Sequence, residues 1–513
     1  MQRKNKQQPS RRQRPYCSWR HAFMLLPVVS VAAWGNNESG DHLWRENTCQ
    51  RRRTVVIVGA GVAGLTAAKR LVTGFDGMDH ANKRQYHRHQ YQHDQDICPP
   101  APKVIILEAS GDFGGRIQKD TTGFADYPLD LGASWVYDPM VRIPLFAQNA
   151  SLYKFLEQNT IAPSRELEYY ESYRIEDDED DSDFEDYIED CPKDEEQQYF
   201  SCNRNARHSE FEMGDEQSLW VNYSWYDFLE EHLVEPTLQR LNPHPHGNNN
   251  FVYNCPVRKV VQHSHDNQIL ATCGGSGGNA EVQQELQEFL ADHVVVTVPL
   301  QILQDGDIQF EPPILPKQNR SIMASSKMWQ GFKIFLEFSK KFYYDAWEWF
   351  PEDGELDFWD YSLVHYPHTS KHIIAGYFIG EFAEELYTLE DDEIAQRVLE
   401  TLDDVFGDNQ ASRYFKNSMV VNWGKNQYIR GIYANQTVPW KRNMGGGPQP
   451  LWGKNNRQLL VAGEAFAVPP NHNGWVDGAA LSGLHAAELI LEDIISPEKM
   501  MFSIPQEIWD EEV

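Results

Sequence analysis

Runs of consecutive apolar residues mark the predicted strands of this chain. The segments 54–58 (TVVIV), 103–110 (KVIILEAS), 254–261 (NCPVRKVV) and 292–300 (DHVVVTVPL) each predict a strand. The first is β-branched throughout, as expected for a strand buried on both faces of a parallel sheet. Segment 331–342 (GFKIFLEFSKKF) alternates instead. We expect a strand there with Lys333 and Phe335 on one face, opposite Phe332, Ile334, Leu336 and Phe338.

A glycine motif follows the first predicted strand. In 54–71 (TVVIVGAGVAGLTAAKRL), Gly59, Gly61 and Gly64 form GxGxxG between a strand and a helix. The first glycine makes the turn, the second lets a pyrophosphate approach the backbone, and the third lets helix and strand pack closely. The phosphates would lie at the helix N-terminus, where free N–H groups favour anions.

An acid is expected at the end of the next strand of such a unit. Here the strand comes late and ends in Glu108, which would bind the adenosine ribose hydroxyls; the alternative is an exposed acid at a strand end. The intervening insert, roughly 74–102, is rich in Gln and His. The irregular spacing of its histidines favours a solvated loop over a metal site. Next, Gly115 brings backbone close to a ligand and Arg116 can neutralise pyrophosphate charge.

Charge is distributed unevenly along the 513 residues. The formal net charge is −30, but residues 1–53 hold eleven Lys or Arg against three acids, so the remainder carries −38. This acidity argues against a nucleic-acid-binding protein or one that adheres to anionic lipid. No apolar run reaches the roughly 20 residues of a membrane-spanning helix, so no stable membrane insertion is expected. The acidic run 176–190 predicts a solvated, disordered segment.

The N-terminal segment has the features of a secretory leader. Residues 1–20 are basic and polar, 22–33 are apolar, and Val31 and Ala33 are small residues placed for cleavage. We expect entry into the secretory pathway, with secretion or delivery to an organelle reached through it. An uncleaved anchor and a disordered tail are the alternatives.

Six of the seven cysteines remain after the leader, so disulfides are possible in an oxidising compartment, with Cys191 and Cys202 the most local pair. No CxxC motif is present, so no metal site is expected.

Seven ordered segments resemble the flavin-containing amine oxidase superfamily, which includes monoamine and polyamine oxidases. They are VVIVGAGVAGLTAAKRL, VIILEASGDFGGRI, DLGASWV, HVVVTVPL, KIFLEF, NWGKNQYIRGIY and GEAF with NGWVDGAALSG, spread over about 54–493. The resemblance implies an α/β fold, in which a Rossmann-type FAD-binding domain is built from discontinuous segments beside an α+β substrate-binding domain. The expected parts are leader 1–53; FAD-binding 54–135, 251–310 and 451–493; substrate-binding 136–250, with an acidic insert at 170–215, and 311–450; and tail 494–513.

The same resemblance assigns cofactor contacts. It places Glu108 at the ribose, Arg116 at the pyrophosphate, Val257 at the adenine through its backbone, and Glu464 near the pyrophosphate and ribitol. The Gly474–Val476 turn would offer backbone donors to the flavin O2. Because no cysteine follows Cys273, the FAD is expected to be non-covalent.

Resemblance also assigns the reacting groups. Lys333 matches the lysine that holds a water beside flavin N5, and Tyr433 and Trp475 match the aromatic pair that flanks the amine. Trp135 and Tyr137 match residues that line the cavity, with Asp138 adjoining. Polyamine oxidases often carry Glu or His at the position of Tyr137, and Ala465 replaces the usual His or Thr.

The resemblance implies oxidation of a small amine, with polyamines as the favoured class and O₂ as the second substrate. The alternatives are an L-amino acid oxidase, for which Arg430 would bind the carboxylate, a carotenoid-type desaturase, or a flavin-binding protein without turnover.

Overall fold

The computed structural model describes part of the chain, all of it within the unit Gln50–Val513. The described residues are 52–74, 102–137, 155, 160–161, 169–171, 207–209, 217–241, 250–263, 268–274, 286–314, 323–343, 349–350, 356–362, 365, 369–438, 449–452, 457–467 and 472–494. Outside them lie residues 1–51 of the leader, the acidic run, Asp138, Cys191 and Cys202, and all of the insert but its two ends.

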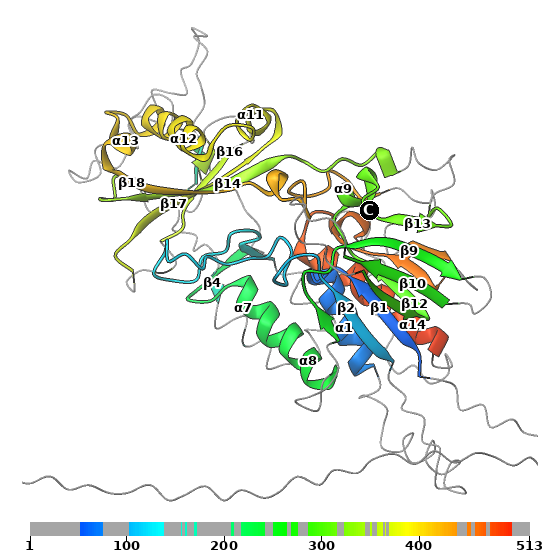
Figure 1. Ribbon diagram of the computed structural model, residues 1–513. Coiled ribbons are helices and arrows are strands. Elements are labelled where there is room, and N and C mark those ends of the chain that lie inside the picture. The colour runs from blue at the N-terminus through cyan, green and yellow to red at the C-terminus, as the bar shows by residue number, and fades with distance from the viewer. Residues whose placement is uncertain are drawn as a thin grey trace, which may run out of the picture. The chain divides into compact units, whose positions relative to one another are not determined.

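A six-stranded sheet carries the glycine motif (Figure 1). The strand order is β19 (Gln449–Trp452), β20 (Leu459–Val461), β12 (His293–Val296), β1 (Thr54–Val58), β2 (Lys103–Leu107) and β8 (Phe251–Val252). All neighbours pair in parallel except β19 with β20. Four distant parts of the sequence thus meet in one sheet, which confirms the predicted α/β class and discontinuous assembly.

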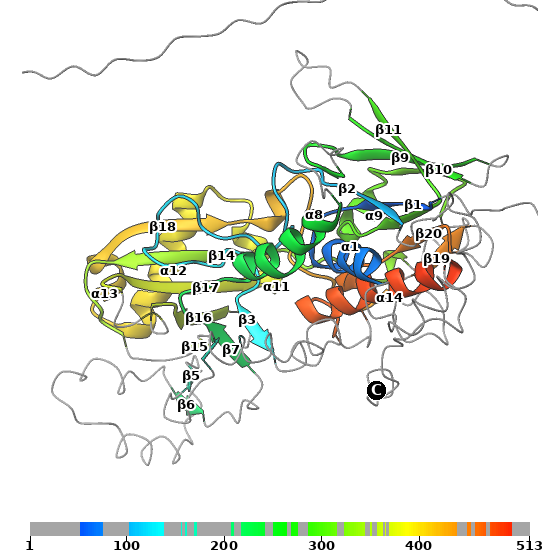
Figure 2. The same cartoon turned by 90° about the horizontal axis from the view of Figure 1, so that it is seen from below.

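Both faces of this sheet are covered. On one face, Val55 and Ile57 pack under α1 (Val62–Thr73) and α14 (Val476–Ile494), the blue and red helices side by side in Figure 2. On the other, Val56 and Val58 pack toward α9 (Leu300–Asp305) and a second sheet. Strand 54–58 is therefore buried on both faces, as predicted. The second sheet has the order β11 (Gln287–Ala291), β10 (Gln268–Cys273), β9 (Val257–His263) and β13 (Gln309–Glu311).

A seven-stranded sheet contains Lys333. Its order is β18 (Phe415–Val421), β14 (Gly331–Phe338), β17 (His372–Ile379), β16 (Leu356–Asp360), β15 (Trp349–Phe350), β5 (Tyr169–Glu171) and β6 (Arg207–Ser209). The helices that lie against it in Figure 1 are α11 (Gly380–Leu386), α12 (Asp391–Phe406) and α13 (Gln410–Tyr414). The predicted alternation of β14 is confirmed, because Phe332, Ile334, Leu336 and Phe338 face these helices while Phe335 joins a different core.

A small sheet and a continuous helical segment complete the described part. The sheet has the order β3 (Trp135–Tyr137), β7 (Gln217–Trp220) and β4 (Thr160–Ile161). The helical segment runs through α7 (Trp225–Leu229), a π-helical turn (Glu230–Val234) and α8 (Glu235–Leu241). Within the described ranges, no helix combines the length and apolarity needed to cross a bilayer.

Two features of this fold were absent from the sequence-based expectations. Strands β10 and β11 lie between the predicted strands 254–261 and 292–300, where no strand was expected. A buried disulfide joins Cys255 to Cys273, whose Cα atoms are 5.2 Å apart. The domain limits stay a prediction.

Candidate active site

The glycine turn lines a cavity of about 450 Å³. A Cβ on Gly59 would lie 2.7 Å from Thr297 Oγ1, and one on Gly64 would lie 2.1 Å from the Gly59 carbonyl. These two glycines are therefore required by the protein's own packing. A Cβ on Gly61 would meet only the Gly114 carbonyl, at 3.9 Å, and Gly61 lines the cavity, so its small size leaves room for a ligand.

Helix α1 begins next to this space. Gly61 is its N-cap, no side chain caps it, and its first turn contains no acid. Its first N–H groups and the positive end of the helix dipole are suited to a phosphate anion. The local chemistry thus fits a dinucleotide.

Glu108 braces the same turn. Its Oε2 accepts from the Ala60 N–H at 2.7 Å, and its Oε1 accepts from the Ser110 N–H at 2.8 Å. The carboxylate is 8% exposed and lines the cavity. Since a carboxylate offers about four acceptor positions, capacity remains for ribose hydroxyls.

Glu464 connects three segments around the cavity. It lies in the short 3-10 turn Glu464–Phe466, and its Oε1 accepts from Arg116 Nη1 at 3.0 Å. Its Oε2 accepts from the Gly474 N–H at 3.0 Å and the Ala434 N–H at 3.2 Å. Arg116 also donates to the Ile432 carbonyl. The Gly474 N–H, expected as a donor to the flavin, is thus already used by Glu464.

The start of β9 also lines the cavity, through Cys255, Val257 and Arg258. The Cys255 N–H donates to the Glu108 carbonyl at 2.8 Å, and the disulfide ties Cys255 to the end of β10. The backbone expected to meet the adenine is therefore held beside the residue expected to meet the ribose.

Lys333 lies in the part of the cavity lined by aromatic residues. Its strand pairs it with Tyr377 on one side and Val421 on the other. Nζ donates to the Gly132 carbonyl at 2.5 Å and to Ser134 Oγ at 2.7 Å. It also lies 5.2 Å from the Trp359 ring centroid, within cation–π range.

Lys333 is only 5% exposed, although strand lysines usually reach solvent. Burial lowers the pKa of Lys333 to about 7, an effect partly opposed by the negative charge of Asp130. Near neutral pH the amine can therefore both hold and release a proton.

Tyr433 and Trp475 both line the cavity, and the cavity also contains Trp135. Tyr433 lies against Gly474, where a Cβ would lie 2.8 Å from the tyrosine ring, at a backbone φ of +81°. Trp475 is 41% exposed. Tyr137 belongs to β3, but its side chain, like Asp138, is outside the described structure.

Several site residues were missed by sequence reasoning. Trp359, Tyr377, Trp423 and Tyr428 line the cavity, while Ser134 contacts Lys333 directly. Trp359 and Tyr377 come from β16 and β17, where no quoted motif marks them, whereas Trp423 and Tyr428 belong to the segment NWGKNQYIRGIY but were given no role from the sequence. Gly132 had a signal, since it stands in DLGASWV: a Cβ there would lie 1.5 Å from the Arg116 carbonyl.

Arg430 is held outside the reacting region. It donates to Asp305 at 2.6 Å and to Asp307 at 3.0 and 2.8 Å, and it is not a lining residue. The arginines in the described lining are Arg116 and Arg258, which pair with Glu464 and Asp307. This arrangement disfavours the binding of a substrate carboxylate by Arg430.

The family model for flavin containing amine oxidoreductases matches residues 62–491. The chain belongs to this family. The family implies a flavin cofactor, FAD, and the open space at Gly61, the uncapped start of α1 and the carboxylate of Glu108 fit the dinucleotide part of that group.

Curated relatives of this chain include polyamine oxidases. Polyamine oxidase 1 of Zea mays is 23% identical over 85% of this chain and 90% of its own length. The peroxisomal N(1)-acetyl-spermine/spermidine oxidase of Bos taurus is 29% identical over 47% of this chain, and probable polyamine oxidase 4 of Arabidopsis thaliana 28% over 45%. The chain spans only 50% and 42% of those two relatives.

Solved structures of amine oxidases share the fold. A putrescine oxidase triple mutant aligns with a TM-score of 0.56 and 15% identity over 86% of this chain and 99% of its own. Cyclohexylamine oxidase from Brevibacterium oxydans IH-35A gives 0.55 and 15%, over 86% of this chain and 100% of its own.

Proposed function

We propose that this protein is an FAD-dependent oxidase of small amines, with polyamines as the preferred class. The observation that carries the proposal is a buried lysine in an aromatic cavity that continues into a dinucleotide cradle. When bound, FAD would supply the redox chemistry, taking a hydride from the carbon next to the amine at its N5 and passing two electrons to O₂ to give H₂O₂.

The aromatic walls prepare the substrate. Tyr433 and Trp475, with Trp359 and Tyr377, offer ring faces to an alkylamine. A dry, apolar surrounding disfavours the ammonium form, so the amine is held closer to its neutral state. Neutrality matters because the nitrogen lone pair assists loss of hydride.

Lys333 is the proton-handling group. Its Nζ would hold the water that hydrolyses the product imine, and its protonated form would stabilise negative charge developing on O₂. A pKa of about 7 suits both duties near neutral pH.

Two further properties belong to this proposal. The FAD is non-covalent: no cysteine follows Cys273, and Cys255 and Cys273 are joined to each other. The protein enters the secretory pathway, an inference supported by the leader and by a disulfide that an oxidising compartment would maintain. Polyamine preference is supported by the names of the relatives and by the acidic body.

An anaerobic titration tests the activity. Purified protein is mixed with spermine, spermidine, N-acetylated polyamines, tyramine or L-amino acids while the flavin absorbance is followed. Rapid bleaching by polyamines is the expected result. Bleaching by amino acids alone would replace the proposal with an amino acid oxidase, and no bleaching by any amine would leave a flavin-binding protein without turnover.

Lys333→Met tests the mechanism. We expect flavin reduction or reoxidation to slow by at least about 100-fold, as for loss of a proton-transfer group, while FAD content is retained. Lys340→Met is the matched control, because Lys340 lies just beyond the same strand and is exposed. Wild-type turnover in Lys333→Met would remove the proposed role.

A further inference from the structure

Asp130 is a buried carboxylate that the proposed chemistry does not use. It is 1% exposed and precedes by two residues Gly132, whose carbonyl accepts from Lys333. We propose that Asp130 is a positioning residue that sets the charge of Lys333 and, through it, the pH range of amine oxidation. The effect on the pH range of amine oxidation rests on the proposed function, whereas the titration of Lys333 can be tested without it.

The same short segment holds both groups. The Asp130 N–H donates to the Tyr361 hydroxyl at 3.1 Å, and Lys333 Nζ donates to the Gly132 carbonyl at 2.5 Å and to Ser134 Oγ at 2.7 Å. The Asp130 carboxylate accepts from the Trp225 N–H at 3.0 and 3.3 Å. Asp130 and Lys333 are thus fixed relative to one another by the segment 130–134 and by Tyr361.

The electrostatics couple these two groups. Burial lowers the pKa of Lys333 and raises that of Asp130, since each charge loses hydration. Their mutual attraction opposes both shifts. Removing the negative charge at 130 would leave burial unopposed, so the pKa of Lys333 would fall further and the lysine would become neutral at lower pH.

Other ionisable groups face this pair. Asp227 raises the pKa of Asp130 and Lys119 lowers it, and these two residues form an ion pair with each other. Tyr361 stays protonated because burial raises its pKa well above its usual value. Tyr377 neighbours Lys333 on β17.

A purely structural role is the alternative. The Trp225 N–H belongs to the first residue of α7, so Asp130 also satisfies a donor at a helix start. A carboxylate that served only this helix would affect stability without changing the titration of Lys333.

Competitive acetylation separates the two roles. The protein as purified is treated with trace acetic anhydride across a pH series, and the labelling of Lys333 is quantified by peptide mass spectrometry, because only the neutral amine reacts. In Asp130→Asn we expect the labelling midpoint to fall by about one pH unit or more. The pH profile of anaerobic flavin bleaching should move in the same direction.

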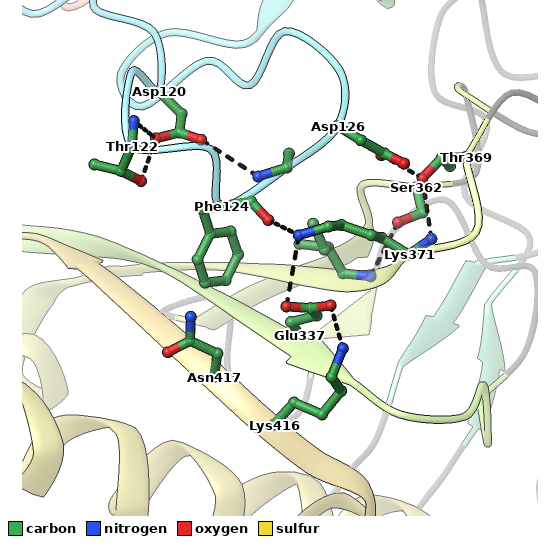
Figure 3. A network of polar contacts seen from close by, with 12 residues as sticks. Asp120, Thr122, Phe124, Asp126, Glu337, Ser362, Thr369, Lys371, Lys416 and Asn417 are labelled. Atoms are coloured by element: carbon green, nitrogen blue, oxygen red, sulfur yellow. Dashed lines mark hydrogen bonds and ion pairs between the residues drawn. The ribbon is translucent and has the colours of Figure 1, made fainter.

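Glu337→Gln is the matched control. Glu337 is buried on the same face of β14 as Lys333, but it lies between Lys371 and Lys416 (Figure 3). Its carboxylate oxygens are 3.6 Å from Lys371 Nζ and 2.6 Å from Lys416 Nζ. The Lys333 midpoint should be unchanged in this variant. Asp130→Glu, which keeps the charge, should stay near the wild-type midpoint and gives a second comparison if the Asn variant folds poorly.

An unchanged midpoint in folded Asp130→Asn, or a shift in Asp130→Glu as large as in Asp130→Asn, would overturn the inference. Labelling needs no turnover, so a protein that oxidises no amine would refute the proposed function while leaving this result readable.

Discussion

Single residues at this site serve the cofactor cradle and the amine cavity together. Glu464 binds Arg116 on the cradle side and the N–H groups of Gly474 and Ala434 on the cavity side. Gly474 in turn lies against the Tyr433 ring. A substitution at one of these positions should therefore alter both the cofactor cradle and the amine cavity.

Gly474→Ala tests this connection. The new Cβ would lie 2.8 Å from the Tyr433 ring, so the ring must shift and we expect kcat/KM for the amine to fall at least about tenfold. Because the φ at this position is +81°, we also expect the free energy of unfolding to fall by about 1–2 kcal/mol. Gly407→Ala carries a similar φ of +71° with no atom within 4 Å, and should lose stability alone. Equal activities in the two variants would show that Tyr433 does not need its present position.

At this scale, motifs predicted the cradle better than the amine cavity. Gly59, Gly61, Gly64 and Glu108 lie within one strand–turn–helix–strand unit, so their spacing is visible in the sequence. The burial of Lys333 depends on Gly132 and Ser134, about 200 residues earlier in the chain, and on Trp359 from another strand. No local pattern encodes such contacts, and Asp130 had no signal beyond its place in a resembling segment.

Among the strands, too, local sequence patterns predicted some elements and missed others. Apolar runs predicted β1, β2 and β12, since strands buried on both faces need no polar positions. Strand β10 (QILATC) was missed because it is short and is flanked by Gly-rich and polar sequence. The disulfide was missed for a related reason: Cys273 meets Cys255 only once β9 and β10 pair.

Removing this disulfide gives an element-scale prediction. Cys255 and Cys273 are 18 residues apart, a loop for which closure contributes about 3 kcal/mol. Cys255→Ala/Cys273→Ala should lower the free energy of unfolding by about that amount in urea and should raise the Kd of FAD. Wild type that has been reduced in denaturant and refolded is the control, and should match the double variant. An unaltered FAD affinity would show that the start of β9 needs no covalent brace.

For the molecule as a whole, acid should destabilise the fold through buried histidines. Burial lowers the pKa of His365 and of His485 to about 4. The unfolded chain binds these protons below about pH 6.5, so it binds more protons than the fold between pH 4 and 6.5, and stability falls as pH falls. The loss reaches up to about 3 kcal/mol for His365 alone.

Thermal unfolding measures this dependence. The Tm should drop between pH 7 and pH 5, and His365→Gln should reduce the drop. His263→Gln, at an exposed position, should leave it unchanged. A pH-independent Tm in the wild type would contradict buried neutral imidazoles.

The acidic body gives a second prediction for the whole molecule. A formal charge of −38 beyond residue 53 should attract polycations, and salt should weaken that attraction. Raising NaCl from 50 to 500 mM should raise the KM for spermine several-fold with kcat unchanged, and should change the KM for tyramine much less. A KM for spermine that ignores salt would leave solubility as the role of the acidic surface.

The discontinuous six-stranded sheet has a consequence for biosynthesis. Strand β1 begins at Thr54, but β20 starts only at Leu459 and α14, which packs beside α1, ends at Ile494. Glu464, which binds Arg116, also comes late. Nearly all of the described chain must therefore be synthesised before the FAD cradle can form, so we expect flavin to bind after translation. Nascent chains arrested before residue 459 should bind no FAD. Until synthesis passes that point, the folded segments therefore lack the stabilisation that the ligand would give.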